Sequence, residues 1–231
     1  MSAPPAVWAH RGASAAFPEN TLEAFAGAIA MGADGIELDV RRTADGALAV
    51  HHDAALADGR TIVRLRADEL PAWVPFLAVA LDACAGVTLN IEIKNVPIDP
   101  DYDPDESVAA RVAELIAERG QHGRVIVSSF SLAAIDAVRS ADEQIPTAWL
   151  TLPRYDQVKA CETVVERGHR ALHPHHSGVT AAVVDAARRH GIALNTWTVD
   201  DPAEMARLAA LGVDAIVTNV PDVAVKTFWP S

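Results

Sequence analysis

Short apolar runs alternate with amphipathic stretches along the whole chain, and this alternation predicts its fold. The apolar runs have the length of strands, whereas the amphipathic stretches repeat their apolar positions with the period of a helix. The predicted strands are Ala6–His10, Gly35–Arg41, Val87–Lys94, Arg124–Phe130, Pro146–Leu152, Ala171–His175, Ala193–Val199 and Ala215–Asn219. The predicted helices cover about 20–31, 75–84, 105–119, 131–140, 154–167, 179–190, 202–211 and 221–228. Eight strand–helix units in this length predict a (β/α)8 TIM barrel.

Residues typical of helix caps support these helix boundaries. Asn20 is expected to be a helix N-cap, with Glu23 three residues later completing a capping box. Glycines follow the predicted helices where C-caps belong, at Gly32, Gly86, Gly120, Gly168, Gly191 and Gly212. A doubly wound open sheet is the alternative, but the glycine-rich turn that usually follows its first strand is missing from this sequence.

One segment departs from a plain barrel. After the second strand, Ala47–Asp53 alternates like an additional strand and is followed by a polar stretch up to Trp73. We interpret this as an insertion at about residues 47–74 within one domain that covers residues 1–231.

The charge balance narrows the class of partner. The net charge is −12, from 31 acidic and 19 basic residues, which argues against nucleic acid and against an anionic membrane surface. No apolar run reaches about 18 residues and the start of the chain does not have the pattern of a signal peptide. We therefore expect a cytoplasmic protein without stable membrane association, which binds a small molecule and is compatible with a homodimer. Cys84 and Cys161 are expected to be buried hydrophobic residues.

Two strands carry polar side chains on alternate positions. Glu37, Asp39 and Arg41 share one face of the second strand. Asn90, Glu92 and Lys94 share one face of the third strand. In a barrel the apolar faces meet the helices, so these polar faces point inward. Two carboxylates about 4 Å apart repel by about 4 kcal/mol at an effective dielectric constant of 20, so a cation or protonation must relieve them.

Three carboxylates without a thiolate are typical of a site for a hard cation, Mg2+ or Ca2+. The predicted ligands are Glu37, Asp39 and Glu92. The alternative is a purely structural set of ion pairs in which Arg41 and Lys94 neutralise these carboxylates.

Histidines stand at the ends of two predicted strands, near the strand that carries Glu37 and Asp39. His10 ends the first strand and is followed by Arg11, a residue type that suits phosphate. His52 ends the additional strand, and alternation turns His51 to the opposite face. Two histidines can accept and donate a proton in one reaction.

Two further clusters have weaker claims. The run Asp99-x-Asp101-x-Asp103-x-Asp105 lacks the central glycine of a calcium loop, so we expect a solvated loop that could line the mouth of the barrel. His173, His175 and His176 lack a completing carboxylate or cysteine. Strand alternation separates His175 from His176, so we expect structural or rim roles.

The ordered set of motifs resembles the glycerophosphodiester phosphodiesterase family over nearly the whole chain. The motifs are Ala9-His10-Arg11-Gly12, Pro18-Glu19-Asn20-Thr21, Gly35-Ile36-Glu37-Leu38-Asp39-Val40, Thr43-x-Asp45-Gly46, Val50-x-x-Asp53 with His52, Asn90-Ile91-Glu92-Ile93-Lys94, Ser128-Ser129-Phe130-Ser131, Trp197-Thr198-Val199-Asp200 and Thr218-Asn219-x-Pro221-Asp222. Each tripeptide is weak by itself, whereas the ordered set is specific.

This resemblance implies a TIM barrel that hydrolyses glycerophosphodiesters to sn-glycerol 3-phosphate and an alcohol. It implies acid/base roles for His10 and His52 and a divalent cation on the three carboxylates named above. By the same resemblance Arg11 and Lys94 bind phosphate. It places Trp197 and Phe130 at the glycerol or alcohol end, and Glu19 near the site or at the start of the first helix.

Three other functions stay open at this point. A lysophospholipase D-type enzyme would use the same barrel on lipid phosphodiesters, but the short insertion and an aromatic content of 5% give little sign of an apolar groove. A barrel that binds phosphate without turnover would not need two histidines. An aldolase-type barrel would use Lys94 as a Schiff base, although its acidic neighbours suit an ion pair better.

Overall fold

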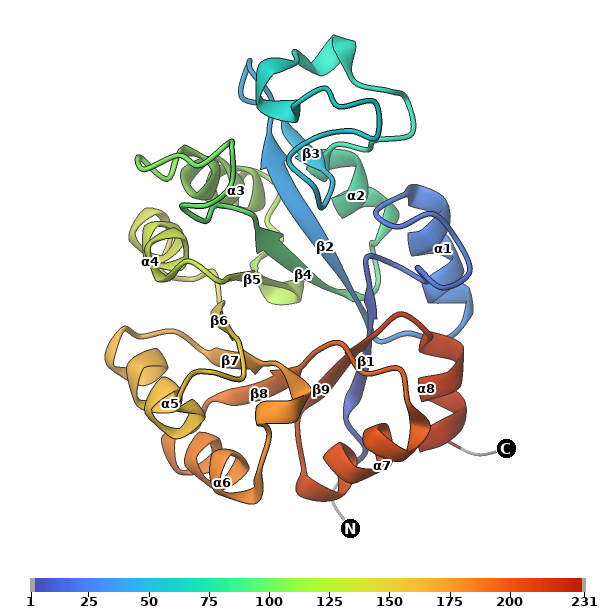
Figure 1. Cartoon of the computed structure of the whole chain (residues 1–231), viewed down its shortest axis with the longest axis vertical. Coiled ribbons are helices and arrows are strands. Elements are labelled where there is room, and N and C mark those ends of the chain that lie inside the picture. Colours follow the sequence, from blue (N-terminus) through green and yellow to red (C-terminus); the bar gives the residue numbers. More distant parts are fainter. Residues whose placement is uncertain (1–2, 230–231) are drawn as a thin grey trace.

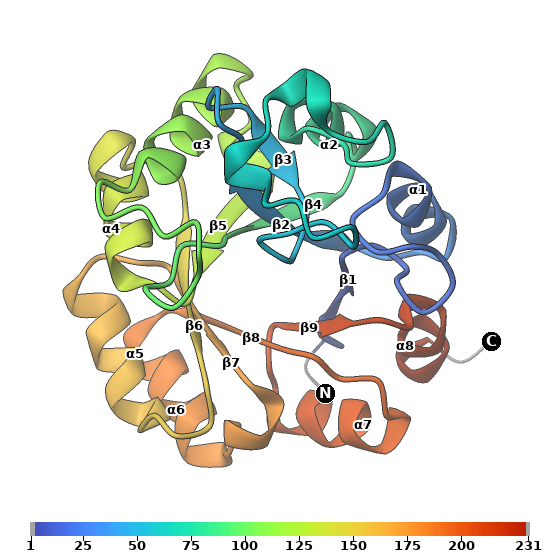
Figure 2. The same ribbon diagram turned by 45° about the horizontal axis from the view of Figure 1, so that its top comes forward.

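Eight parallel strands close into a ring in the computed structural model, which describes residues 3–229, and helices surround this ring (Figures 1 and 2). The strands in ring order are β1 (Ala6–His10), β2 (Gly35–Arg42), β4 (Thr88–Ile93), β5 (Val125–Ser129), β6 (Thr147–Thr151), β7 (Ala171–Pro174), β8 (Ala193–Thr196) and β9 (Ala215–Thr218). β1 pairs with both β2 and β9, and this double pairing closes the barrel. The predicted (β/α)8 fold is confirmed, and closure excludes the doubly wound open sheet.

Helices follow the barrel strands in regular alternation. They are α1 (Leu22–Ala30), α2 (Leu77–Ala83), α3 (Ser107–Glu118), α4 (Leu132–Ala141), α5 (Gln157–Glu166), α6 (Ala181–His190), α7 (Pro202–Leu211) and α8 (Pro221–Phe228). Gly191 and Gly212 are left-handed C-caps of α6 and α7, as expected for residues that tolerate positive φ.

The predicted N-cap at Asn20 is wrong by one residue. Thr21 caps α1, because its side chain accepts a hydrogen bond from the backbone N–H of Ala24. Asn20 has a φ of +58° and turns its amide toward the barrel interior, where it contacts Asp39. The residue is therefore part of the polar interior and not of the helix start.

The strand faces divide as the alternation predicts. Ile36, Leu38 and Val40 of β2 are fully buried in the apolar layer under the helices. The register between β2 and β4 places Glu37 opposite Asn90 and Asp39 opposite Glu92. This register brings the acidic side chains of two strands together at the carboxyl ends of the barrel.

The expected additional strand forms, but it is shorter than predicted. β3 (Leu48–Val50) pairs antiparallel with the end of β2, which extends beyond the ring (Figure 1). The rest of the insertion folds over a small apolar cluster of its own, formed by Ala49, Leu56, Ile62 and Val74. Two short 3-10 turns, Ile62–Arg64 and Ala67–Glu69, follow within it.

The acidic run after β4 is not the solvated loop that we expected. Asp101 and Asp103 are buried. Asp101 pairs with Arg41, and Asp103 accepts hydrogen bonds from the backbone and side chain of Ser107. The loop is thus fixed by its own carboxylates. Among the described helices none is long and apolar enough to cross a membrane.

Both cysteines are buried thiols, as predicted. Burial raises the pKa of Cys84 to about 12 and that of Cys161 to about 11. At neutral pH these groups are therefore uncharged apolar side chains of the core.

Candidate active site at the carboxyl ends of the strands

A cavity of about 280 Å³ opens at the carboxyl ends of the strands, the end at which TIM barrels carry their active sites. Eight of the ten side chains proposed from the sequence line it. The full lining consists of His10, Arg11, Glu37, His52, Asn90, Glu92, Lys94, Phe130, Leu150, His173, Trp197, Thr198 and Val217. The other two, Asp39 and Glu19, lie behind it and contact Arg11.

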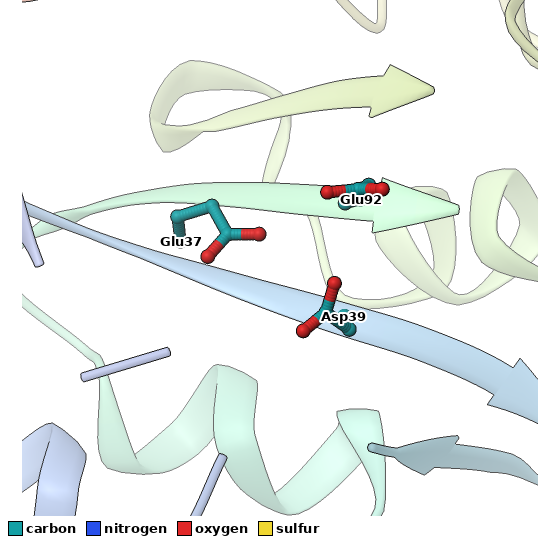
Figure 3. A group of neighbouring side chains, drawn as sticks. All are labelled: Glu37, Asp39 and Glu92. Carbon is teal, nitrogen blue, oxygen red and sulfur yellow. The ribbon is translucent and has the colours of Figure 1, made fainter. Parts of the chain in front are cut away.

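The three carboxylates proposed as metal ligands form one buried cluster. Glu37 and Asp39 extend from β2 and Glu92 from β4 into the same space (Figure 3). One oxygen atom from each lies within 4.8 Å of the others. Glu37 Oε1 and Asp39 Oδ1 are buried and accept no hydrogen bond. Buried carboxylate oxygens without donors are the arrangement that a hard divalent cation satisfies, so the cluster fits Mg2+ or Ca2+.

Burial shifts the pKa values of the three carboxyl groups. Burial, reinforced by the like charges of Asp39 and Glu92, raises the pKa of Glu37 well above its ordinary value. Burial also raises the pKa of Glu92, against the opposing charge of Lys94. For Asp39, burial acts in the same direction, but Lys94 and Arg11 outweigh it and lower the pKa. A bound cation would relieve the repulsion that raises the first two values.

Two side-chain cations face the cluster. Lys94 Nζ lies 2.7 Å from Glu92 Oε1 and 3.4 Å from Asp39 Oδ1. Arg11 Nε lies 3.2 Å from Asp39 Oδ2, and its Nη1 donates to both carboxylate oxygens of Glu19. The cluster of three carboxylates thus has two cationic neighbours, which leaves capacity for both a cation and an anionic ligand.

Arg41 does not neutralise the cluster, contrary to the structural alternative. Its Nη1 donates to Asp101 and its Nη2 lies 3.2 Å from Asp99. Its Nε donates to the backbone carbonyl of His52 at 2.7 Å. Arg41 stands beyond the pairing of β2 with β4, where the strand leaves the ring and meets β3.

The two proposed catalytic histidines have different partners. His10 Nδ1 lies 2.7 Å from Asn219 Oδ1, and its Nε2 lies 3.9 Å from Glu37 Oε2. Burial and the charge of Arg11 lower the pKa of His10. His52 Nδ1 lies 2.8 Å from Asp53 Oδ1.

His51 turns away from the cavity, as expected, although β3 ends at Val50 and strand alternation does not extend to this residue. Its ring lies against Trp73 with a centroid separation of 5.9 Å, and its Nδ1 contacts the carbonyl of Asp53. The structure therefore supports the choice of His52 over His51 as the residue that faces the cavity.

Two aromatic side chains form part of the cavity wall. Phe130 and Trp197 meet edge to face with a centroid separation of 5.5 Å. Trp197 Nε1 donates to the carbonyl of His173, which fixes the indole. The indole and phenyl rings give this side of the cavity an apolar surface.

The histidine cluster of β7 has structural and rim positions, as expected. His173 is buried in the floor of the cavity, where its Nε2 meets Asn195 Nδ2. The expected separation of His175 and His176 is wrong, since their ring centroids are 4.4 Å apart. The strand ends at Pro174 and a 3-10 turn follows, so strand alternation does not apply there.

The site roles of two residues, Asn20 and Asn219, are not indicated by the sequence pattern. Asn20 donates from Nδ2 to Asp39 Oδ2 at 2.9 Å and accepts from the backbone N–H of Asp39 at 3.3 Å. Asn219 contacts His10. Both lie inside the motifs that carry the family resemblance, but a motif does not tell which neighbour an amide meets.

A closed parallel barrel with an acidic cluster, two histidines and two cations at its carboxyl ends has the make-up of a phosphate-ester hydrolase. The chain belongs to the glycerophosphoryl diester phosphodiesterase family, whose model matches residues 10–223. It is 32% identical to the glycerophosphodiester phosphodiesterase of Bacillus altitudinis, over 95% of this chain and 96% of that protein. The caldanaerobacterial enzyme of the same name (Caldanaerobacter subterraneus subsp. tengcongensis) is 28% identical over 95% of this chain and 96% of its own.

Solved structures agree with this relationship. The glycerophosphodiester phosphodiesterase of Thermotoga maritima is 29% identical and superposes with a TM-score of 0.83, covering 98% of this chain and 99% of that one. An Oleispira antarctica phosphodiesterase, solved in complex with the product sn-glycerol-3-phosphate, shares the fold with a TM-score of 0.86 at 23% identity over 97% of this chain and 96% of that one.

Proposed function

We propose that this protein hydrolyses glycerophosphodiesters to sn-glycerol 3-phosphate and an alcohol, with a divalent cation and with His10 and His52 as the proton-transfer groups. The observation that carries this proposal is the shared cavity. In it both imidazoles face a buried, undersatisfied carboxylate cluster, within a chain that belongs to the phosphodiesterase family.

The cation would be Mg2+ or Ca2+, held by Glu37, Asp39 and Glu92. When bound, it supplies positive charge that stabilises the additional negative charge of the phosphoryl transition state. Every donor in the set is a carboxylate oxygen, which suits these hard cations better than a transition metal.

The protein side chains supply the remaining chemistry. Arg11 and Lys94 would bind the phosphate oxygens, and Glu19 would hold the guanidinium of Arg11 in place. The apolar wall of Phe130 and Trp197 would take the carbon atoms of the glycerol or of the leaving alcohol.

Proton transfer is divided between the two histidines. One removes the proton from the attacking hydroxyl, which is either water or the neighbouring glycerol hydroxyl, and the other protonates the leaving alkoxide. Attack by the glycerol hydroxyl would form a cyclic phosphate, which water then opens.

A substrate panel with matched histidine variants tests this proposal. Release of sn-glycerol 3-phosphate is measured from glycerophosphocholine, glycerophosphoethanolamine and glycerophosphoglycerol, with lysophosphatidylcholine as the lipid comparison and with Mg2+ or Ca2+ added. His10→Ala and His52→Ala should each lower kcat by at least about 100-fold. His51→Ala is the control and should retain activity, because His51 faces away from the cavity. Near-full activity of the His10→Ala/His52→Ala double variant, or turnover of the lipid substrate alone, would overturn the proposal.

A further inference from the structure

A chain of hydrogen bonds connects His10 to a carboxylate outside the cavity. His10 Nδ1 lies 2.7 Å from Asn219 Oδ1, and Asn219 Nδ2 donates to Asp200 Oδ2 at 2.6 Å. The three residues come from the ends of three neighbouring segments: β1, the residue after β9, and the loop between β8 and α7. Closure of the barrel through the pairing of β1 with β9 brings His10 and Asn219 together.

The far end of the chain fixes the direction of the amide. Asp200 also accepts hydrogen bonds from Thr218 Oγ1 at 2.9 Å and from the backbone N–H of Asn219 at 2.8 Å. The carboxylate oxygens of Asp200 are the acceptors in all three contacts. The Asn219 atom that faces Asp200 must therefore be the NH2 group, and the atom that faces His10 must be the carbonyl oxygen.

The near end then fixes the proton on the imidazole. An amide oxygen has no proton to give, so the ring nitrogen at 2.7 Å must carry one. Ser14 Oγ, which lies 2.8 Å from the same oxygen, is a second donor and leaves this conclusion unchanged. Neutral His10 is thus protonated on Nδ1, and its unprotonated Nε2 lies on the side of Glu37 and the cavity.

We propose that Asn219 is a positioning residue that holds His10 in the Nδ1–H tautomer, with Asp200 setting the orientation of its amide, so that the unprotonated Nε2 faces the cavity. This inference rests on the proposed function for the role of His10, whereas the tautomer itself does not depend on it.

The proton balance of the proposed reaction is compatible with this tautomer. His10 Nε2 takes the proton of the attacking O–H group as its oxygen bonds to phosphorus. The bond from phosphorus to the leaving oxygen breaks, and that oxygen takes the proton of His52. The two histidines return to their starting states by proton exchange with water. If a cyclic phosphate forms, its opening by water resets them, because the two roles reverse in that step.

Nitrogen NMR of the full-length protein tests the tautomer directly. The protein is labelled with 15N-histidine, and His10 is assigned by loss of its signals in His10→Gln. We expect the His10 signals of a protonated Nδ1 and an unprotonated Nε2. In Asn219→Leu the Nδ1–H form should lose its preference. Ser14→Ala should leave the tautomer unchanged, because it removes a donor to the same oxygen without disturbing the pair that orients the amide. A wild-type His10 protonated on Nε2, or an unchanged Nδ1–H form in Asn219→Leu, would overturn the proposal.

Kinetics and a swap of the two side chains test its consequence. Asn219→Leu should lower kcat by about 10–100-fold, the usual cost of removing a group that orients a site histidine, with little change in KM. Asn219→Asp alone should also be impaired, because it places two carboxylates in contact. The double variant Asn219→Asp/Asp200→Asn again has an acceptor for His10 at position 219 and an amide donor to that acceptor at position 200. It should therefore recover activity. Equal impairment of the single and double variants, or full activity of Asn219→Leu, would contradict the positioning role. If no variant and no wild-type protein hydrolyses glycerophosphodiesters, the proposed function fails, and the NMR result still decides the tautomer.

Discussion

Arg41 Nη1 lies 2.7 Å from both carboxylate oxygens of Asp101, and both side chains are buried. The same guanidinium donates from Nε to the backbone carbonyl of His52. This pair therefore connects the outer end of β2, the loop that follows β4 and the segment that carries a proposed catalytic histidine. An acidic loop that seemed suited to solvent instead supports the mouth of the site.

Asp101→Asn should destabilise the protein markedly. The change removes the charge that compensates buried Arg41, and loss of one partner of a buried pair costs about 3–5 kcal/mol. Asp99 remains 3.2 Å from Arg41, so we expect about 3 kcal/mol, at the lower end of that range. Urea unfolding measures the free energy. Asp105→Asn, an exposed change in the same loop, is the control, and equal stability of the two variants would show that the Arg41 pair contributes nothing.

Asn20→Gly should weaken cation binding. The amide fixes Asp39 through two hydrogen bonds, and residues that orient metal ligands typically contribute 10–100-fold to affinity, so a loss of about that size is expected. Glycine is chosen because Asn20 has a φ of +58°, which glycine adopts without strain. Titration calorimetry with Mg2+ measures the affinity, and exposed Glu23→Gln is the control. Wild-type affinity in Asn20→Gly would mean that Asp39 needs no support.

The order of the elements could be predicted from the sequence because the apolar periodicity of each unit is local. All eight barrel strands lie where that pattern placed them; β1 matches at both ends, and each of the others differs by one to three residues at one or both ends. The inward direction of Glu37, Asp39 and Glu92 could be predicted as well. In a closed barrel the apolar strand faces pack against the helices, so the alternate polar faces point into the barrel. The difference at Asn20 has a tertiary cause: its amide contacts a carboxylate 19 residues away rather than its own helix.

The remaining site contacts depend on long-range packing that a single sequence does not encode locally. Asn219 meets His10 across 209 residues, only because the last strand of the barrel pairs with the first. Arg41 was an obvious candidate to neutralise the carboxylates. Arg41 pairs with Asp101 instead, because β2 extends past the ring at this point. Alternation along a single strand does not predict such an extension.

Lys94→Met should change cation binding and catalysis in opposite directions. The ammonium lies 2.7 Å from Glu92 and 3.4 Å from Asp39, so its removal leaves more negative charge for a cation. A unit charge at about 4 Å contributes on the order of 4 kcal/mol at an effective dielectric constant of 20, so Mg2+ affinity should rise at least about tenfold. kcat/KM should fall, because a phosphate ligand is lost. Lys226→Met, at an exposed ion pair with Asp222, is the control. Weaker cation binding in Lys94→Met would contradict this description of the cluster.

Stability should fall in acid because of His173. Complete burial lowers the pKa of His173 to about 3. In the unfolded chain the imidazole has its ordinary pKa of about 6.5, so the unfolded state binds the additional proton between pH 6.5 and pH 3. His173 therefore has no effect above pH 6.5, and it favours unfolding increasingly as pH falls below that value, by up to about 1.4 kcal/mol per pH unit.

His173→Gln tests this dependence. The free energy of unfolding, measured by urea at a series of pH values, should lose less on acidification in His173→Gln than in the wild type. His190→Gln removes an exposed imidazole and serves as the control. Parallel curves for His173→Gln and the wild type would mean that His173 is protonated within the folded protein.

Turnover of glycerophosphocholine by stripped and reloaded protein tests the central claim most directly. Protein treated with EDTA and freed of the chelator should release no sn-glycerol 3-phosphate, and Mg2+ or Ca2+ should restore release. Glu37→Gln, which removes one carboxylate of the cluster, should not be restored at the same cation concentration. Undiminished release by fully stripped wild-type protein would contradict the account, because it would leave the carboxylate cluster without a part in the reaction.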